Sequence, residues 1–520
     1  MVEPRLFTNT LPCSTMVAAT MSFLSQLIPP FGSLQVLLVT AVCALVLVLL
    51  SFRRPRNLPP GPRGLPIVGN ALSLRTNVPL VFTEWSKKYG DVLTVYTGPM
   101  LTIVLNGYAA IHEALVKNAD VFSSRPSSSA SMTPDEKTLG IAQEPYGPKW
   151  KEHRKFALMS LRDFGVGKRS MEGKILEETR ALHDEISKNR IKAFCISHMM
   201  QNTVSNVICS IVFGCRYEYR DKKFQDLLMA IDRVLRRTSA DHLAVMLRPL
   251  RYIPGVRKGY LDLRNSQAVL VNHIKDRIRE HQETFDENDI RDFIDAFLLE
   301  SKKRQTDENT TFTEQELATV VLQLFLAGTD TTSTTLRWAL LYMILHPDIQ
   351  GKVQQEIDSV LGPSQEPSMV HRSQMPYTEA ALTEVSRLAT IAPISLPHGT
   401  SRDTTFRGYN IPEDTLVAVN IWSVHHDPQL WPDPSKFDPA RFLDDAGKFV
   451  KRTEVIAFST GRRVCLGEQL ARMEIFLIFT SLLQRFTFKL PEGAPKPSEE
   501  GVFRGIHAPV PFKLRAEPRN

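Results

Sequence analysis

The sequence contains few cysteines, and no pattern ties them together. Six cysteines occur among 520 residues, none of them in a C-x-x-C pair, and their spacing matches neither a disulfide framework nor a zinc finger. The chain also lacks internal repeats and low-complexity tracts. We therefore expect reduced thiols in a cytosolic compartment, and we expect ordinary packing roles for five of the six: Cys13, Cys43, Cys195, Cys209 and Cys215.

The sequence lacks the basic tracts of a nucleic-acid-binding protein. Its net charge is +7, but no run of Lys and Arg is interleaved with aromatic residues. The hydrophobic content of 43% and the charged content of 23% are those of an ordinary globular protein. A mildly basic surface fits a membrane or an acidic protein partner better than a nucleic acid.

Charged residues are also missing from residues 6–52. Within this stretch, residues 31–52 form an almost continuous apolar run, and about 20 such residues are enough to cross a bilayer as a helix. Arg53, Arg54 and Arg56 follow it. By the positive-inside rule these arginines leave the rest of the chain in the cytoplasm, and no cleavage site of a signal peptide follows the run. We therefore predict a transmembrane anchor at residues 31–52.

The sequence before and after the anchor indicates how the rest of the chain is divided into segments. An apolar segment precedes the anchor, and two prolines separate it from the main run. Whether this segment also inserts into the membrane is left open. Beyond the anchor, helical patterns dominate, and residues 91–107 indicate a β-hairpin. We expect an apolar segment at residues 1–30, the anchor, a basic and proline-rich linker at 53–70, a catalytic domain at 71–515 and a tail at 516–520.

One long helical pattern carries its poorest helix formers at its centre. The pattern begins at Thr313, which forms a predicted capping box with Glu316. The central stretch "LFLAGTDTTSTTLRW", residues 324–338, contains Gly328, Asp330 and five threonines. Glycine and threonine disfavour helices, and a buried carboxylate is costly. The centre of this helix is therefore expected to do more than pack.

A second motif surrounds the sixth cysteine. In "FSTGRRVCLG", residues 458–467, Cys465 follows two arginines and precedes a helical pattern. Cations and a helix N-terminus favour a thiolate, which serves as a nucleophile, a redox centre or a metal ligand. No His–Asn partnership typical of a cysteine protease is evident. A lone cysteine suits a metal that another cofactor already holds, as in haem with an axial thiolate.

Together these motifs resemble the cytochrome P-450 superfamily of haem-thiolate enzymes, over residues 59 to about 515, and are most similar to the animal family two. The resemblance implies a mainly α fold with small β-sheets and an N-terminal transmembrane helix. The matching motifs are F-x-x-G-x-R-x-C-x-G (Phe458, Gly461, Arg463, Cys465, Gly467), E-x-x-R (Glu384, Arg387), P-x-R-F (Pro439, Arg441, Phe442), W-x-x-x-R (Trp150, Arg154) and A-G-x-D/E-T (Ala327, Gly328, Asp330, Thr331).

The resemblance implies haem b as the cofactor, with Cys465 as the ligand of its iron. Glu384, Arg387 and Arg441 are expected to form a buried charge network that supports the cysteine loop. The other residues implied in cofactor binding are Phe458 and Gly467 in the loop, and Arg125, Trp150, Arg154, His398 and Arg463 at the haem propionates.

On the opposite side of the haem, the resemblance assigns catalysis to the long helix. Gly328 is expected to relax or bulge the helix and leave room for dioxygen. Thr331 is expected to donate a hydrogen bond to dioxygen, and Asp330 to feed protons through water. The threonines at positions 332, 334 and 335 are expected to bond the preceding turn of the helix.

The resemblance places the substrate against mostly small or apolar residues, namely Ala327, Ala392, Leu396 and Ile506. They favour a lipophilic substrate such as a fatty acid, a steroid or a xenobiotic, and Asp330 leaves a cationic amine open. His507 is an unusual polar neighbour in this group. His425, His426 and Asp427 resemble a metal cluster, but they lie in the proline-containing stretch of the family that ends in P-x-R-F, and packing is the better interpretation.

The implied activity is a monooxygenase that inserts one atom of dioxygen into its substrate. Electrons would come from NADPH through NADPH–cytochrome P-450 reductase, with cytochrome b5 as a second candidate partner. The basic segment "KWKEHRKF", residues 149–156, would face the acidic reductase. The implied location is the endoplasmic reticulum membrane, with a cytoplasmic catalytic domain. A haem-thiolate isomerase or dehydratase acting on hydroperoxides and a non-catalytic haem sensor are the alternatives, and the retained acid–threonine pair argues against both.

Overall fold

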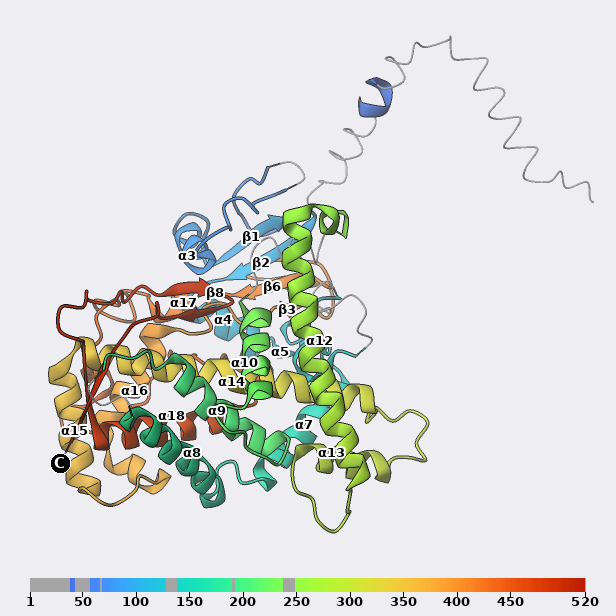
Figure 1. Ribbon diagram of the computed structural model, residues 1–520. Helices are drawn as coiled ribbons and strands as arrows, with labels where there is room; N and C mark the ends of the chain where they lie inside the picture. Colours follow the sequence, from blue (N-terminus) through green and yellow to red (C-terminus); the bar gives the residue numbers. More distant parts are fainter. Residues whose placement is uncertain are drawn as a thin grey trace, which may run out of the picture.

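The computed structural model describes residues 38–42, 57–65, 68–127, 138–188, 192–236 and 248–519. Helices dominate this part of the chain and the sheets are small, as predicted (Figure 1). The helical elements are α3 (Val78–Tyr89), α4 (Tyr108–His112), η1 (Glu113–Lys117), α5 (Ala119–Phe122), α6 (Gly140–Gln143), α7 (Pro148–Asp163), α8 (Arg169–Ser187), α9 (Ser197–Val212), α10 (Lys222–Leu235), η3 (Arg248–Tyr252), α12 (Pro254–Glu283), α13 (Phe293–Lys303), α14 (Glu314–Leu345), α15 (Pro347–Leu361), η4 (Met369–Gln374), α16 (Pro376–Ala389), α17 (Ile421–His425), η5 (Pro439–Phe442), η6 (Gly461–Arg463) and α18 (Glu468–Arg485).

The strands form one four-stranded sheet and three two-stranded sheets among the described residues. The largest sheet has the order β1-β2-β6-β3, in which only the β2–β6 pair is parallel. The smaller sheets pair β10 with β7, β4 with β5, and β8 with β9. The strands are β1 (Val92–Thr97), β2 (Met100–Leu105), β3 (His398–Gly399), β4 (Thr404–Phe406), β5 (Tyr409–Ile411), β6 (Leu416–Val419), β7 (Phe486–Lys489), β8 (Val502–Arg504), β9 (Ile506–Ala508) and β10 (Arg515–Pro518).

The predicted hairpin at residues 91–107 is β1 and β2, which pair from Val92↔Leu105 to Thr97↔Met100. The described residues 57–65 of the proline-rich segment before it lie against this hairpin. The backbone N–H of Thr94 donates to the carbonyl of Pro60 at 2.9 Å. A Cβ on Gly61 would lie 1.9 Å from the Thr94 carbonyl oxygen, so only glycine fits there. The described residues 57–65 are thus part of the folded domain.

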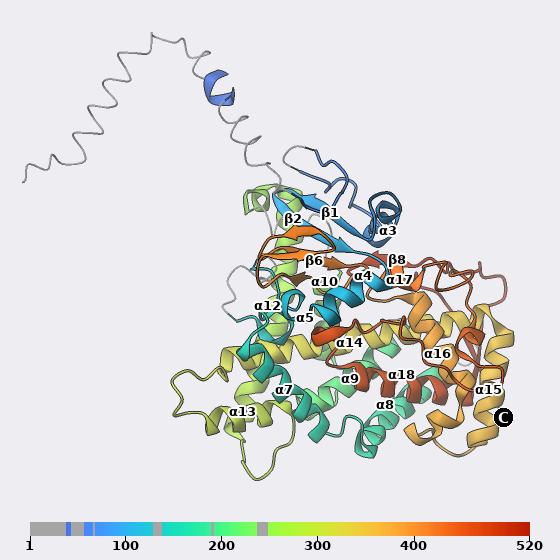
Figure 2. The ribbon, with the colours of Figure 1, turned by 180° about the vertical axis from the view of Figure 1, so that it is seen from behind.

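The long predicted helix is α14, which crosses the middle of the helical part in both views (Figures 1 and 2). It packs against α9, α16 and α18, and nearly all of its surface beyond Thr331 is buried. At its start, Thr313 Oγ1 accepts a bond from the N–H of Glu316 at 3.2 Å. The predicted capping box is only half formed, because the Glu316 carboxylate instead pairs with Lys149 Nζ at 3.1 Å.

The expected bulge at Gly328 is not present, since α14 is an uninterrupted α-helix from Glu314 to Leu345. The glycine has another structural reason. A Cβ at this position would lie 2.9 Å from Cγ1 of Ile208 in α9. Gly328 therefore allows α9 and α14 to approach more closely than any side chain would permit.

The predicted apolar segment and anchor at residues 1–52 lie outside the described residues, apart from residues 38–42. These form a helical turn in which Leu38, Val39 and Val42 are exposed. Within the described part of the chain, no helix combines the length and apolar character needed to span a bilayer.

Candidate functional site

The loop that carries Cys465 is fixed by its own backbone and by a close neighbour. The N–H of Cys465 donates to the carbonyl of Phe458 at 3.0 Å, which closes the loop. Gly461 has a φ of +77°, and a Cβ there would lie 2.1 Å from the carbonyl oxygen of Leu115 in η1. This position therefore demands glycine. After the loop, α18 begins at Glu468.

Cys465 is exposed, and its sulfur accepts hydrogen bonds from the backbone N–H groups of Gly467 and Glu468. The protein around the sulfur raises the pKa of the thiol by burial, and this effect exceeds the opposing influence of the N–H groups and of Arg154. The predicted thiolate is therefore not favoured by the protein alone. A cation at the sulfur is required to hold it deprotonated near neutral pH.

The five residues predicted to hold the propionates converge on one region beside this loop. They come from four separate segments of the chain, because Trp150 and Arg154 both lie in α7, and all five bond backbone carbonyls. The bonds run from Arg125 Nη1 to Pro397 O (2.6 Å), from Trp150 Nε1 to Ile141 O (3.2 Å), from Arg154 Nη2 to Val464 O (2.6 Å), from His398 Nδ1 to Phe122 O (2.8 Å), and from Arg463 Nε to Ser123 O (2.8 Å) and Nη2 to Glu144 O (2.6 Å).

The cluster carries positive charge without a matching carboxylate. Among the described residues, no carboxylate forms an ion pair with Arg125, Arg154 or Arg463. Burial lowers the pKa of Arg125 to about 10, and burial with the two neighbouring arginines lowers that of Arg463 to about 9. His398 is fully enclosed, and burial with the arginines lowers its pKa to about 3, so it is neutral. The arrangement suits an anionic ligand with two carboxylates.

The E-x-x-R residues form the predicted buried charge network. Glu384 binds Arg387 through both carboxylate oxygens at 2.6 and 2.7 Å, and both side chains are completely buried. Arg441 Nε lies 3.3 Å from the same carboxylate. Arg387 also donates to the carbonyl of His425 at 2.6 Å, and His425 Nε2 accepts from the N–H of Ile456. The network thus reaches the segment that leads into the cysteine loop, and His425 has the packing role that the sequence predicted.

Along the centre of α14, one stripe is accessible while its flanks are buried. Ala327 is exposed, and Leu324, Gly328 and Thr331 are half-buried. Their three- and four-residue spacing places them on one face of the helix. The Thr331 hydroxyl donates to the carbonyl of Ala327 at 2.8 Å. Ala327 and Thr331, the predicted substrate and dioxygen residues, thus share an accessible face at the centre of this helix, and Gly328 borders that face where α9 packs against α14.

Asp330 lies on a different face of α14 and is buried, with no hydrogen-bond partner for its Oδ2 atom among the described residues. Burial raises the pKa of this carboxyl, and the nearby Arg236 and Arg337 only partly oppose that effect. The protonated form is therefore favoured over a wider pH range than for an ordinary aspartate.

The comparisons with known proteins agree with this geometry. The family model described as "Cytochrome P450" matches residues 59–515. The human protein named Cytochrome P450 2U1 is 40% identical over 510 residues, which cover 92% of this chain and 93% of that protein. The rat protein named Cytochrome P450 2D4 is 39% identical over 503 residues, covering 94% and 99% respectively. The chain is a cytochrome P450. It is accordingly a haem-thiolate monooxygenase.

The residues of this cytochrome P450 fit haem b. The guanidinium groups of Arg125, Arg154 and Arg463, which lack an ion-pair partner among the described residues, match the two propionates of haem, and the haem iron would be the cation that holds the Cys465 thiol deprotonated. The haem supplies the iron at which dioxygen is activated. The loop at residues 458–467 supplies both Cys465 and Arg463, whereas Arg125 and Arg154 come from other segments.

The other predicted substrate positions differ in exposure. Leu396 is 59% exposed, which is unusual for a leucine inside a helical domain, and Ala392 and Ile506 are half-buried. Arg125 donates to the backbone carbonyls of Leu396 and Pro397, so Leu396 adjoins the cationic cluster. Of the described cysteines assigned to packing, only Cys209 is buried; Cys195 is exposed and Cys215 is half-buried. Those two flank α9 and lie outside its buried pattern.

Sequence reasoning missed two residues that connect the site to its surroundings. Gln323 of α14 accepts from the N–H of Ala142 at 2.9 Å and donates to the carbonyl of Leu139 at 2.8 Å, and so ties α14 to the segment beneath the cationic cluster. Glu474 of α18 is buried and accepts a bond from Thr332 of α14. The sequence did contain a signal for Glu474, because a glutamate inside the apolar run of α18 is unusual.

Glu474 gives this cytochrome P450 a predictable dependence of stability on pH. Burial raises the pKa of Glu474 to about 8, above its value in the unfolded chain. The folded state therefore binds the proton more tightly, and the free energy of unfolding falls as pH rises from about 4.5 to about 8. The loss is at most about 5 kcal/mol. In Glu474→Gln we expect the thermal midpoint to decline less over this range than in the wild type.

The matched control is Glu492→Gln, because the Glu492 side chain is 96% exposed. Its pH profile of the thermal midpoint should parallel that of the wild type. A parallel profile for Glu474→Gln as well would show that Glu474 ionises normally in the folded protein.

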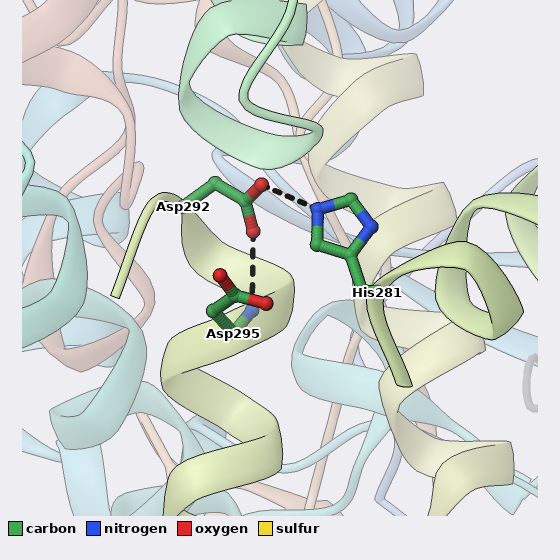
Figure 3. A group of neighbouring side chains, drawn as sticks. All are labelled: His281, Asp292 and Asp295. Carbon is green, nitrogen blue, oxygen red and sulfur yellow. Dashed lines mark hydrogen bonds and ion pairs between the residues drawn. The ribbon is translucent and has the colours of Figure 1, made fainter. Parts of the chain in front are cut away.

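Another buried group of possible ligands has a structural role. His281, Asp292 and Asp295 lie together where α12 ends and α13 begins (Figure 3). His281 Nε2 bonds Asp292 at 2.6 Å, and Asp292 caps α13 by accepting from the N–H of Asp295 at 3.1 Å. Arg291 binds both oxygens of Asp295. Because every charge has a partner, the cluster fastens the two helices and needs no metal.

Proposed function

We propose that this cytochrome P450 is a membrane-bound enzyme that oxidises lipophilic substrates with electrons from NADPH, delivered by a flavoprotein reductase. The observation that carries the substrate class is the apolar character of the accessible positions, above all Ala327 on the open stripe of α14 and the exposed Leu396. Fatty acids, steroids and xenobiotics share the required apolar surface.

The outer face of α7 supports a reductase partner. Lys151, Lys155 and Arg162 are exposed on this helix, and the apolar residues between them, Leu158 and Met159, are 44% and 56% exposed. On the inner side of α7, Arg154 bonds the carbonyl next to Cys465. A basic surface with an apolar centre, directly behind the iron ligand, suits an acidic electron donor, and its association should weaken with salt. Cytochrome b5 is a second candidate for this surface.

Exposed apolar residues on another side favour membrane contact. Tyr252 is 83% exposed and Ile253 is 49% exposed, at the junction of η3 and α12. Basic residues flank this pair in the sequence, as in segments that lie at a lipid surface. With the predicted anchor at residues 31–52, this surface supports residence at the endoplasmic reticulum membrane with the catalytic domain in the cytoplasm.

Proton delivery is proposed for Asp330 and Thr331. The raised pKa of Asp330 lets it hold a proton at neutral pH more readily than an ordinary aspartate, and the Thr331 hydroxyl lies on the open stripe. Water between the two would pass protons to the oxygen that accepts them. We predict that Thr331→Ala retains haem but diverts reducing equivalents to hydrogen peroxide, which is measured as peroxide formed per NADPH consumed.

The control for this variant is Thr335→Ala. Thr335 makes the same kind of bond one turn later on the same face of α14, to the carbonyl of Thr331 at 3.0 Å, but it is buried beyond the end of the open stripe. It should leave the peroxide yield near that of the wild type. Equal coupling in Thr331→Ala and the wild type would remove Thr331 from the proton path.

The experiment that tests the substrate class uses the full chain in lipid vesicles with the reductase and NADPH. Polyunsaturated fatty acids, steroids and drug-like amines are supplied together, and products are identified by mass spectrometry. NADPH-dependent oxidation of the lipophilic compounds is expected. Turnover of hydroperoxides without NADPH would instead favour the isomerase alternative, and preferential oxidation of cationic amines would assign Asp330 to substrate binding.

A further inference from the structure

His507 of β9 is joined to three other parts of the chain by all four of its polar groups. Its N–H donates to the carbonyl of Ile391 at 2.8 Å, and its carbonyl accepts from Trp338 Nε1 at 3.1 Å. On the ring, Nδ1 lies 2.5 Å from the carbonyl oxygen of Ala389, and Nε2 lies 2.6 Å from that of Glu500. The side chain is 1% exposed. His507 therefore connects the β8–β9 hairpin to α14 and to the end of α16.

The two ring contacts cannot both be hydrogen bonds of a neutral histidine. A neutral imidazole has one N–H donor and one nitrogen lone pair, whereas a carbonyl oxygen only accepts. One contact of a neutral ring therefore sets a lone pair against a carbonyl oxygen. The imidazolium form, which has two N–H groups, satisfies both carbonyls at once. The two carbonyl oxygens therefore favour the ring form that carries a second proton.

Burial and the carbonyls act on this proton in opposite directions. Burial lowers the pKa of His507, and the carbonyls of Ala389 and Glu500 raise it without reversing the effect of burial. The ring is thus neutral near pH 7 and gains its second N–H on acidification. The buried titratable and charged side chains nearest on the adjoining elements are Asp330 and Arg337 of α14, Glu384 and Arg387 of α16, and His425 of α17; His426 follows α17, and Glu500 is exposed. Of these, His426 stays neutral, because burial lowers its pKa to about 3.

The surroundings hold the ring in place. Phe503 of β8 stacks on it with ring centroids 4.3 Å apart, and Trp422 of α17 meets it edge-on at 5.3 Å. Gly501 has a φ of +66°, and a Cβ there would lie 2.5 Å from His507 Nε2 and 2.6 Å from Trp338. Only glycine leaves the space that the ring occupies.

We call the contacts that His507 makes through its backbone and ring the His507 clamp. This clamp lies next to the two segments that carry the predicted substrate residues Ile506 and Ala392. Successive strand residues point to opposite sides, so an inward His507 turns the half-buried Ile506 to the other face of the hairpin. The backbone bond to Ile391 fixes the residue before Ala392. We propose that His507 is the positioning residue of the β8–β9 hairpin, and that a second ring proton completes its clamp and tightens the substrate-facing Ile506. The part that concerns substrate rests on the proposed function.

Hydrogen exchange of the haem-loaded full chain tests the clamp without turnover. Exchange of the backbone amides of residues 502–508 is measured by mass spectrometry in steps from about pH 7.5 down to about pH 4 and corrected for intrinsic exchange rates. In the wild type, acidification should slow the corrected exchange about fivefold, because one hydrogen bond is gained. His507→Phe keeps the stacked ring but has no N–H, and it should show no such change.

The control is His426→Phe, which removes the neighbouring titratable ring and should keep the full response of the wild type. If His507→Phe does not retain haem, His507→Asn is compared in its place. An equal acid response in the His507 variant and the wild type, or no response in the wild type, would overturn the proposal. An acid response lost in His426→Phe would assign the proton to His426 instead.

A second readout tests the link to substrate. The ratio of oxidation products from one lipophilic substrate is measured over the same pH range in the wild type and in His507→Phe. The proposal expects a shift of this ratio with pH in the wild type alone. If acid slows the exchange but the product ratio does not change with pH, the clamp is retained and its role in determining the products is excluded. If no lipophilic compound gives any product, that result counts against the proposed function only.

Discussion

Cys465→Ala is expected to abolish the spectrum of thiolate-ligated haem. The backbone N–H groups of Gly467 and Glu468, at the start of α18, are directed at the sulfur of this exposed cysteine. Alanine keeps the loop backbone, because the bond from the N–H of residue 465 to Phe458 does not use the side chain. The measurement is the difference spectrum of the reduced protein with and without carbon monoxide, whose position reports a thiolate ligand.

The control for Cys465 is Cys195→Ala, since Cys195 is an exposed thiol beside α9. It should give the wild-type spectrum and the wild-type haem content. A thiolate spectrum that persists in Cys465→Ala would refute the ligand assignment. Loss of the spectrum in both variants would mean that the preparation, not the ligand, had failed.

Arg387→Gln is expected to have the largest effect on stability. Arg387 and Glu384 are both completely buried, and the substitution leaves the carboxylate of Glu384 with the more distant Arg441 as its cationic partner and the backbone N–H of Asp438 as a donor. It also removes the donor to the His425 carbonyl. Removing one partner of a buried ion pair costs about 3–5 kcal/mol. We expect a large fall of the thermal midpoint and loss of haem from the purified protein.

Arg180→Gln is the matched control for this prediction. Arg180 pairs with Glu366 in a similar two-point geometry, but the two side chains are 53% and 44% exposed. Water screens such a pair, which contributes about 0–1 kcal/mol. Circular dichroism and haem absorbance during heating measure both variants. Similar midpoints for Arg387→Gln and Arg180→Gln would contradict a supporting role for the buried network.

The parts of the site that the sequence predicted well are those set by short-range motifs. Cys465 lies in a loop closed by its own backbone, and Glu384 and Arg387 stand one helical turn apart, so their relation follows from helix geometry. The length of α14 likewise follows from its periodic apolar residues. The five residues of the cationic cluster come from four distant segments, with Trp150 and Arg154 together in α7, and only the resemblance to a known family placed these segments together.

The features that the sequence did not predict depend on contacts between distant segments. Gly328 suggested a bulge in the helix, but the structure requires a glycine there because Ile208 of α9, more than one hundred positions away, occupies the space of a side chain. Nearby cations suggested a thiolate at Cys465, but the balance between those cations and burial is a property of the folded protein. For the same reason, His507 was recognised as unusual, whereas the two carbonyls that face its ring could not be foreseen.

The central claim is that this chain inserts one atom of dioxygen into a lipophilic substrate. The most direct measurement is the isotopic composition of the product formed by the full chain with reductase and NADPH, once under isotopically labelled dioxygen and once in labelled water. The account predicts one labelled atom from dioxygen in each product molecule and none from water. Product that carries no label from dioxygen, or that forms equally well without NADPH, would contradict it.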